Sequence, residues 1–288
     1  MSKCKWLFDY HMLKDAYHKD LVELCEELNI EYEVLTYIPN YKALQITPFQ
    51  ENPTFEKGEC VVAYGSIEFL EALDSLNMGY IPSRYMEINA LKCSHYLPNI
   101  PSEYLLNDNF IMLPYKEFKK NPNRIYDLYE TNKLFVRPDS GLKTFAGTTI
   151  HIEDFDYEIN SLENLTSVLP TTMILVSPIK KIEKEYRILV GNRKVIAASQ
   201  YKIKDTVFMK EGAPEQAIKL AEKIISLPEQ PDIVYTVDIA QTITGEYKVI
   251  ELNSFSAAGL YHCNPEIVLK KVSKIAELEY NGDISLGE

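Results

Sequence analysis

The sequence predicts a mixed fold: a small α/β layer at residues 1–90, followed by a strand-rich α+β unit at residues 91–288. Two observations predict it. Strand-like and helix-like patterns alternate over the first 90 residues, whereas β-type runs dominate from about residue 131. With 288 residues, of which 46% are hydrophobic and 25% charged, the chain can bury a core in two modest domains.

The N-terminal elements follow in order. Residues 5–9 (KWLFD) form a short apolar run that predicts a first strand. Apolar residues then recur at spacings of three to five from residue 13 to residue 28, which predicts one helical face. Two more strands are predicted at 31–37 and 60–64, and a helix at 67–76. This order favours a small α/β layer.

The rest of the chain changes character twice. The segment 91–130 holds four prolines and predicts a linking region with short helices. Gly191-Asn192 is a signal for a tight hairpin, and Asn264 with Pro265 suits the start of a last helix. Strands are predicted at 134–137, 173–176, 186–190, 194–201, 233–240 and 248–252, and helices at 214–226 and 265–279.

Charge and composition exclude several classes of protein. The formal net charge of -12, without a block of Lys or Arg, disfavours a general nucleic-acid binder. The five cysteines form no C-x-x-C pair, which fits a reduced, intracellular protein. No apolar stretch approaches the ~20 residues that a membrane span needs. We therefore expect a cytoplasmic protein, or one that acts inside a host cell, without a membrane partner.

A glycine-containing loop with cations follows one of these strands. In FVRPDSGLKTFAG, residues 135–147, the strand ends at Arg137, and Gly141, Lys143 and Thr144 follow in one loop. Glycine lets backbone N–H groups approach a phosphate, and Lys or Arg neutralises its charge. A plain surface hairpin is the alternative, since the segment lacks the Walker pattern.

Two later strands bring oxygen-bearing side chains together. Asp238 lies at the centre of VDIAQ, and Glu251 and Asn253 lie at the end of VIELNSFS, with the turn TGEY between the runs. Antiparallel pairing would place the three side by side, and the two-residue period puts Glu251 and Asn253 on one face. Such a cluster suits Mg²⁺, which prefers hard oxygen donors. The alternative, polar strand ends, leaves an acid buried at a cost.

A third segment, MILVSPIKKIEKEYR at 173–187, runs from an apolar strand through Ser177-Pro178 into a charged stretch. A connection of this kind can offer backbone groups to an adenine edge and a carboxylate to ribose hydroxyls. An ordinary charged linker remains the alternative.

Taken in order, the three segments resemble the ATP-grasp superfamily over roughly residues 90–280. Within it they are similar to the ATP-grasp proteins found in phages and bacteria, through V-R-P-x-x-G-x-K, E-Y-R, S-x-Y and E-L-N-S-F-S. The resemblance implies an ATP-grasp fold, in which two α+β lobes clamp ATP, preceded here by the α/β domain. It also implies that a phage-encoded relative would act in the host cytoplasm.

The resemblance assigns roles residue by residue. Arg137 stands where many relatives carry a phosphate-binding Lys, and Glu185 matches the ribose-binding Glu. Implied nucleotide contacts are Lys92, Arg137, Lys143, Thr144, Val176, Ser177, Ile179, Glu185 and Lys202; implied catalytic residues are Arg137, Lys143 and Arg187; implied magnesium ligands are Asp238, Glu251 and Asn253.

The implied reaction is ATP-dependent ligation. A substrate carboxylate attacks the γ-phosphate of ATP, ADP leaves, and an amine displaces phosphate from the acyl-phosphate to give an amide. The cofactors are ATP and Mg²⁺, with Mn²⁺ as a substitute. Positioning and charge neutralisation would supply most of the catalysis. The partners are small-molecule or peptide carboxylates and amines, or a protein substrate, and homodimers are common in such folds.

The acceptor pocket is expected at residues 254–261 (SFSAAGLY), together with Arg187 and Tyr201, although this segment could equally be a connector. His262 is the best histidine candidate for the substrate side, and Cys263 is more consistent with a small buried residue. Two other functions stay open: an ATP-grasp kinase that phosphorylates a hydroxyl, and a non-enzymatic nucleotide-binding interaction protein.

Overall fold

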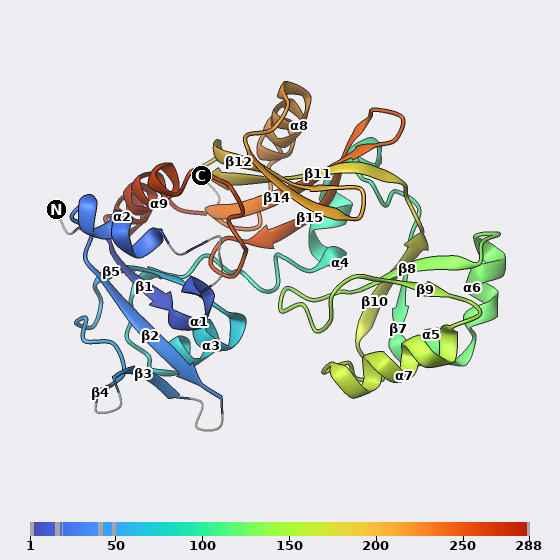
Figure 1. Ribbon diagram of the computed structural model, residues 1–288, viewed down its shortest axis with the longest axis horizontal. Coiled ribbons are helices and arrows are strands. Elements are labelled where there is room, and N and C mark those ends of the chain that lie inside the picture. The colour runs from blue at the N-terminus through green and yellow to red at the C-terminus, as the bar shows by residue number, and fades with distance from the viewer. Residues whose placement is uncertain (1–2, 15–17, 19, 40–42, 48–49, 287–288) are drawn as a thin grey trace.

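Three β-sheets organise the described part of the chain, which comprises residues 3–14, 18, 20–39, 43–47 and 50–286 of this computed structural model (Figure 1). In the N-terminal part the strands are β1 Lys5–Asp9, β2 Tyr32–Ile38, β3 Ala43–Thr47, β4 Gln50–Glu51, β5 Cys60–Tyr64 and β6 Ile81–Ser83, and the helices are α1 Tyr10–Leu13, α2 Leu21–Glu27 and α3 Ile67–Ser75.

The N-terminal sheet has the order β4-β3-β2-β1-β5-β6, and β2, β1, β5 and β6 run parallel. In β1, Trp6 and Phe8 face one core, whereas Leu7 faces another that includes α3. Burial on both faces explains the continuous apolar runs and confirms the predicted strands at 5–9 and 60–64. The single helix predicted over 13–28 is wrong: α1 and α2 are separate, and residues 15–17 and 19 lie outside the described residues.

A four-stranded antiparallel sheet follows, with the order β7-β10-β8-β9. Helices α5, α6 and α7 pack beside it (Figure 1) and share its core. The predicted link at 91–130 does contain short helices, but it also contains β7, whose four residues end in Pro114 at the sheet edge, a place that tolerates proline. Its elements are α4 Cys93–Tyr96, η1 Leu97–Asn99, η2 Ser102–Tyr104, β7 Ile111–Pro114, α5 Tyr115–Lys120, α6 Pro122–Leu128, β8 Lys133–Pro138, β9 Thr148–His151, α7 Phe155–Leu165 and β10 Met173–Pro178.

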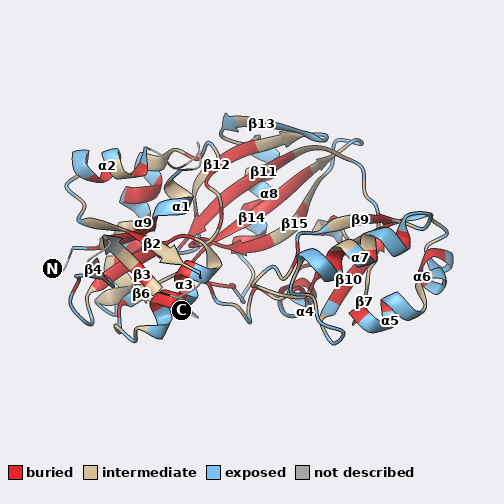
Figure 2. Ribbon diagram, turned by 60° about the horizontal axis from the view of Figure 1, so that its bottom comes forward, coloured by how far each residue is buried: buried red, intermediate tan, exposed pale blue. Residues whose placement is uncertain are grey.

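The third sheet is antiparallel, in the order β13-β12-β11-β14-β15, and its central strands are mostly buried (Figure 2). The predicted hairpin at Gly191-Asn192 joins β11 to β12, and its turn residues Asn192 and Arg193 have φ of 43° and 57°. The elements are β11 Ile182–Gly191, β12 Lys194–Ile203, β13 Thr206–Glu211, α8 Glu215–Ile225, β14 Val234–Thr242, β15 Tyr247–Ser254 and α9 Pro265–Tyr280.

Helix α9 joins the two ends of the described chain. Asn264 caps it by accepting a hydrogen bond from the Ile267 N–H at 3.1 Å, as predicted. Its apolar face shares one core with β1 and β5, and the Trp6 indole donates to Ser273 Oγ at 2.9 Å. A boundary between two domains at residue 90 therefore stays a prediction. At 16 residues α9 is the longest described helix, and none of the described helices is long and apolar enough to cross a membrane.

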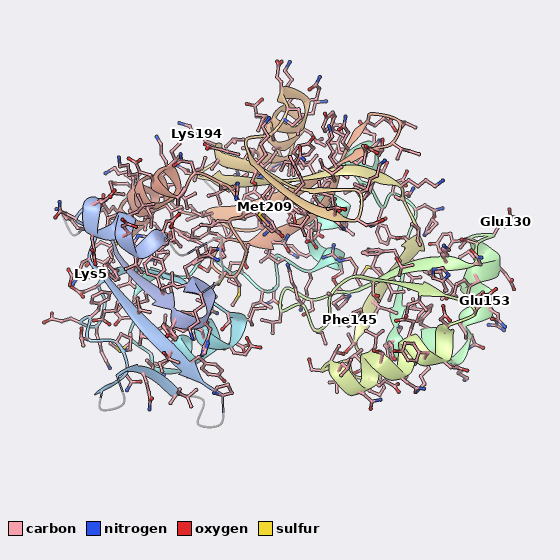
Figure 3. The ribbon with its side chains drawn as sticks, in the orientation of Figure 1. Lys5, Glu130, Phe145, Glu153, Lys194 and Met209 are labelled. Carbon is pink, nitrogen blue, oxygen red and sulfur yellow. The ribbon has the colours of Figure 1, made fainter. Side chains whose placement is uncertain are left out.

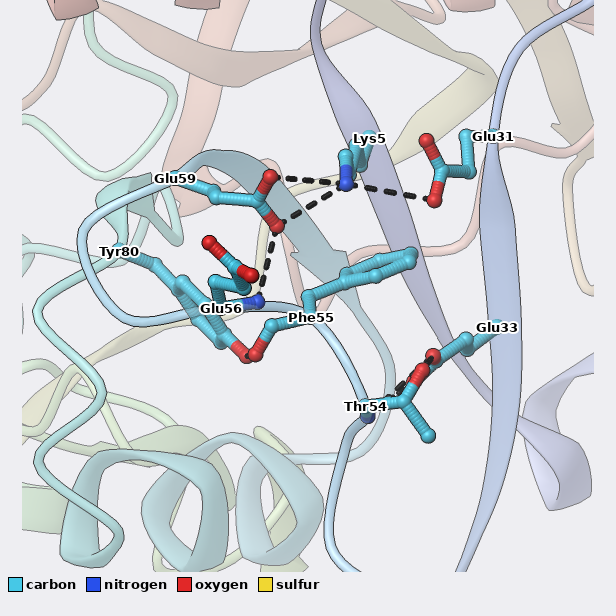
Figure 4. A network of polar contacts seen from close by, with 8 residues as sticks. All are labelled: Lys5, Glu31, Glu33, Thr54, Phe55, Glu56, Glu59 and Tyr80. Atoms are coloured by element: carbon cyan, nitrogen blue, oxygen red, sulfur yellow. Dashed lines mark hydrogen bonds and ion pairs between the residues drawn. The ribbon is translucent and has the colours of Figure 1, made fainter.

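A polar cluster fixes the segment before β5 against the N-terminal sheet (Figure 4). Lys5 Nζ lies 2.8 Å from a carboxylate oxygen of Glu59 and 3.2 Å from one of Glu31. The same amine lies 4.8 Å from the centre of the Phe55 ring, and the Tyr80 hydroxyl donates to the Phe55 carbonyl at 3.0 Å. Strand β1 is thereby tied to both of its neighbours outside the apolar core.

A buried acid before β14 makes stability depend on pH. Asp232 is 7% exposed, and its carboxylate accepts hydrogen bonds from the N–H groups of Ile233 at 2.7 Å and Glu87 at 3.3 Å. Burial raises the pKa of Asp232 to about 8. The folded chain therefore keeps a proton that the unfolded chain loses above about pH 4. Stability from this group is complete below that pH and declines as the pH rises towards 8.

We expect Asp232→Asn to remove this decline, because the amide does not ionise. Relative to the unchanged protein, the variant should gain up to roughly 1.4 kcal/mol of unfolding free energy per pH unit between about pH 5 and pH 8. Urea unfolding at both pH values measures the difference, with exposed Asp156→Asn as the control. Parallel pH profiles for the variant and the unchanged protein would contradict the assignment.

Candidate active site

A cavity of about 500 Å³ lies between the four-stranded and the five-stranded sheets. Strand β8 contributes Phe135 and Arg137 to its wall, and β15 contributes Ile250 and Glu251. The loop between β8 and β9 forms a further side and includes Phe145, which Figure 3 labels. Two of the three segments singled out in the sequence thus meet at one cavity, together with part of the third.

The three oxygen-bearing side chains converge as predicted. Strands β14 and β15 pair with Asp238 opposite Glu251, and Asn253 lies two residues further along β15. Asn253 Nδ2 donates to Glu251 Oε1 at 2.9 Å and to Asp238 Oδ2 at 3.2 Å. The role of the three as metal ligands stays a prediction.

An arginine on β11 saturates Asp238. Arg187 Nε donates to Asp238 Oδ1 at 2.9 Å, and the Arg187 terminal nitrogen Nη2 donates to Oδ2 at 2.7 Å. The two residues are 5% and 2% exposed. Burial opposes the charge on Arg187, but the adjacent Asp238 outweighs it and raises the arginine pKa above its ordinary value. A bidentate pair with so little water contact is strongly charge-assisted.

A second arginine neutralises Glu251 from the other side. Arg137 Nη2 lies 2.8 Å from Glu251 Oε2. Burial acts to raise the pKa of Glu251, but the charges of Arg137 and Lys143 outweigh it and lower the pKa to about 2. Glu251 is therefore ionised at neutral pH, and Arg137 remains charged at the cavity wall.

Two contacts hold the loop between β8 and β9. Asp139 accepts hydrogen bonds from the Ser94 N–H at 2.9 Å and the Ser94 hydroxyl at 2.6 Å. A Cβ on Gly141 would lie 2.5 Å from the carbonyl oxygen of Ile88, so only glycine fits this approach. Lys143 reaches the cavity, as predicted, whereas Thr144 is not among the residues that line it.

The connection from β10 to β11 supplies a further wall. Val176 and Ser177 are fully buried in β10 and do not line the cavity, whereas Ile179 does. Glu185 accepts a hydrogen bond from the Tyr201 hydroxyl at 2.7 Å and lies 3.1 Å from Lys202 Nζ. Both Glu185 and Lys202 face the cavity, where the resemblance placed them.

Lys92 is not brought to the cavity. Its Nζ donates to Asn89 Oδ1 at 2.9 Å, and it is not among the lining residues. Sequence reasoning also missed lining residues. Phe135 could have been found, because it lies two residues before Arg137 on the same strand and so shares its face. Asn107 lies outside any regular strand or helix and left no periodic signal.

Beyond Asn253 the chain is held rather than free. The rings of Tyr201 and Tyr261 stack with centres 4.6 Å apart, and the Arg187 guanidinium lies 4.8 Å from the Tyr261 ring. Arg187 also donates to the Gly259 carbonyl at 2.8 Å. A small cavity lined by Lys143, Asn253 and Ala257, among others, adjoins this segment. An acceptor pocket at 254–261 stays a prediction.

The two residues that follow carry no reactive geometry. The His262 N–H donates to Ser199 Oγ at 3.1 Å. Cys263 is 3% exposed, and burial raises the pKa of its thiol to about 12, as expected of a small buried residue.

The donor set suits a hard cation only in part. Glu251 is ionised, and the Asn253 amide oxygen is left available because the amide nitrogen makes the contacts. Both oxygens of Asp238 already accept from Arg187. Within the described ranges no group of three or more His, Cys, Asp or Glu could hold a metal ion; this set has two carboxylates and one amide.

Comparison with known proteins agrees with this geometry. The model of a family described as an ATP-grasp domain, the second family of its clade, matches residues 120–271. Among solved structures, the D-cycloserine synthetase DcsG is similar with a TM-score of 0.60 at 12% identity, over 95% of this chain and 99% of that one.

Two further structures have the same fold. The D-alanyl-alanine synthetase A of Vibrio cholerae gives a TM-score of 0.55 at 11% identity, over 96% of this chain and 99% of that one. The ATP-grasp ligase PsnB with a minimal precursor gives 0.54 at 12% identity, over 96% and 100%. A search by sequence among curated proteins found no match. At these identities the likeness concerns the fold.

The buried pair predicts a large effect on stability. Arg187→Met leaves the Asp238 carboxylate buried without its cation, which should lower the unfolding free energy by about 3–5 kcal/mol. Chemical denaturation at neutral pH measures the loss. The matched control is Lys119→Met, which breaks an exposed pair with Glu163 (2.8 Å) and should cost less than about 1 kcal/mol. Equal losses in the two variants would contradict the assignment.

Proposed function

This chain belongs to the ATP-grasp family, within the second family of one of its clades, and from that membership we propose that it is an ATP-dependent ligase that joins a carboxylate to an amine. One observation carries the proposal: Asp238, Glu251 and Asn253 converge beside the wall that presents Arg137 and Lys143 to one cavity. Anionic and cationic groups side by side suit a metal-bound triphosphate.

The nucleotide would lie in the large cavity. Its phosphates would face Arg137 and Lys143, and its ribose would face Glu185. The paired structure of the site supports this, because Arg137 is fixed by Glu251 at 2.8 Å and so needs no reorganisation to meet a phosphate. Thr144 and Lys92 stay weaker candidates, since neither lines the cavity.

Glu251 and Asn253 would hold the divalent cation, for which we propose Mg²⁺ with Mn²⁺ as a substitute. Bound there, the cation would supply Lewis-acid stabilisation of phosphate charge. Asp238 would contribute to the site through its negative charge and through its contact with Asn253, while Arg187 holds its oxygens.

The chemistry would proceed in two displacements. A substrate carboxylate oxygen attacks the γ-phosphorus of ATP, the bond to the β-phosphate oxygen breaks, and ADP leaves with that electron pair. An amine then attacks the acyl carbon, phosphate departs, and the amine loses one proton. Arg137 and Lys143 would neutralise charge on the transferring group, and Arg187, which lies beside the segment 254–261, would orient the acceptor side.

Similar structures support this direction without fixing the substrates. DcsG is a synthetase, and PsnB is a ligase solved with Mg and ADP. Their printed substrates, a cycloserine product and a precursor peptide, differ in size. We therefore propose only the reaction class for this chain.

We expect the purified protein to release ADP and phosphate in equal amounts when Mg-ATP is supplied with pools of amino acids, short peptides and polyamines. Mass spectrometry should show a product joined by loss of one water. Lys119→Met, far from the cavity, is the matched control. ADP without phosphate would instead identify a kinase, and ATP binding without turnover against every pool would favour a non-catalytic nucleotide-binding protein.

Glu251→Gln should raise the Mg²⁺ concentration that gives half-maximal turnover by at least about tenfold, because it removes the ionised donor. Manganese binding, followed by electron paramagnetic resonance without any acceptor, provides a readout independent of turnover. Unchanged Mn²⁺ affinity in this variant would remove Glu251 from the metal site while leaving the ligase assignment to the product analysis.

A further inference from the structure

The segment between η2 and β7 is fixed to both sheets beside the cavity. On one side the Leu106 N–H donates to the Val249 carbonyl of β15 at 2.9 Å. On the other side Lys180, which follows β10, places its Nζ 2.7 Å from Asp108. Asn107 lies between these two anchors and lines the cavity, so its position is set from both directions.

The orientation of the Asn107 side chain is fixed as well. Ser177 is fully buried on β10, and its hydroxyl donates to Asn107 Oδ1 at 3.2 Å. A carbonyl oxygen has two lone pairs, so Oδ1 keeps one acceptor position. Over the residues that the structure describes, Asn107 Nδ2 has no hydrogen-bonded acceptor in the protein. The amide thus offers one acceptor and one donor group to a ligand.

The surroundings of this amide are apolar. Phe135, Ile179, Ile182 and Ile250 line the same cavity. The Phe135 ring is held close to Gly147, where a Cβ would lie 2.6 Å from its Cζ atom. Lys180 is nearby, but Asp108 pairs with it. An apolar slot with one oriented amide is suited to a flat heterocycle that carries a donor next to an acceptor.

We propose that Asn107 is the residue that reads the nucleobase, an inference that rests on the proposed use of ATP. Oδ1 accepts a hydrogen bond from the 6-amino group of adenine, and Nδ2 donates to ring nitrogen N7, the pairing that asparagine makes with adenine elsewhere. Hypoxanthine and guanine carry a carbonyl oxygen at position 6, which opposes Oδ1. Ser177 is a positioning residue, because its hydroxyl keeps the amide from turning over.

The test measures dissociation constants of ATP and ITP with Mg²⁺ by calorimetry. The unchanged protein should prefer ATP by roughly tenfold to hundredfold, the discrimination expected of a bidentate contact. Asn107→Leu, which keeps the shape and removes both polar groups, should bring the two constants to within about threefold. Asp108→Asn, at the exposed neighbour, should keep the preference and serves as the matched control.

Two measurements keep the inference testable if Asn107→Leu does not fold. Ser177→Ala should lower the ATP preference through the orientation of the amide alone, and 7-deaza-ATP should bind the unchanged protein several-fold more weakly than ATP. Equal ATP and ITP affinities in the unchanged protein, or an intact preference in Asn107→Leu, would overturn the inference. Failure of the unchanged protein to bind any of these triphosphates would instead overturn the proposed function.

Discussion

The site depends on one arrangement of charge across three neighbouring strands. On β14, Asp238 has Arg187 of β11 as its register neighbour on one side and Glu251 of β15 on the other. Two carboxylates so close repel each other, and the structure answers with one arginine for each. Asn253 donates to both acids and separates them. Removing water from such a cluster is costly unless every charge is matched, which here it is.

The same arginine connects the two functional sides of the proposed enzyme. Besides holding Asp238, Arg187 contacts the Gly259 carbonyl and the Tyr261 ring in the segment proposed for the acceptor. Tyr261 stacks on Tyr201, whose hydroxyl reaches Glu185 at the cavity wall. A continuous chain of packed polar and aromatic groups thus runs from the nucleotide side to the acceptor side, and a shift at either end would be felt by the other.

Much of this was accessible from the sequence, for identifiable reasons. The apolar runs of β1 and β5, buried on both faces, and the alternation around Glu251 and Asn253 are strong local signals, so the pairing of β14 with β15 could be predicted. Contacts between distant segments could not. Asn107 meets Ser177 across 70 residues, a contact that no periodicity encodes. Lys92 was placed by resemblance alone, and its local bond to Asn89 keeps it elsewhere. Short edge strands such as β7 and β13 were missed because few of their residues are buried.

The packing of α9 against β1 has a consequence for synthesis on the ribosome. Trp6 and Phe8 emerge early, whereas the helix that shields them, and the Ser273 hydroxyl that meets the indole, emerge only after the whole catalytic region. The first sheet therefore spends most of translation with one apolar face uncovered, open to chaperones or to a neighbouring nascent chain. Completion of the fold is a late event that draws the earliest strand and the last helix together.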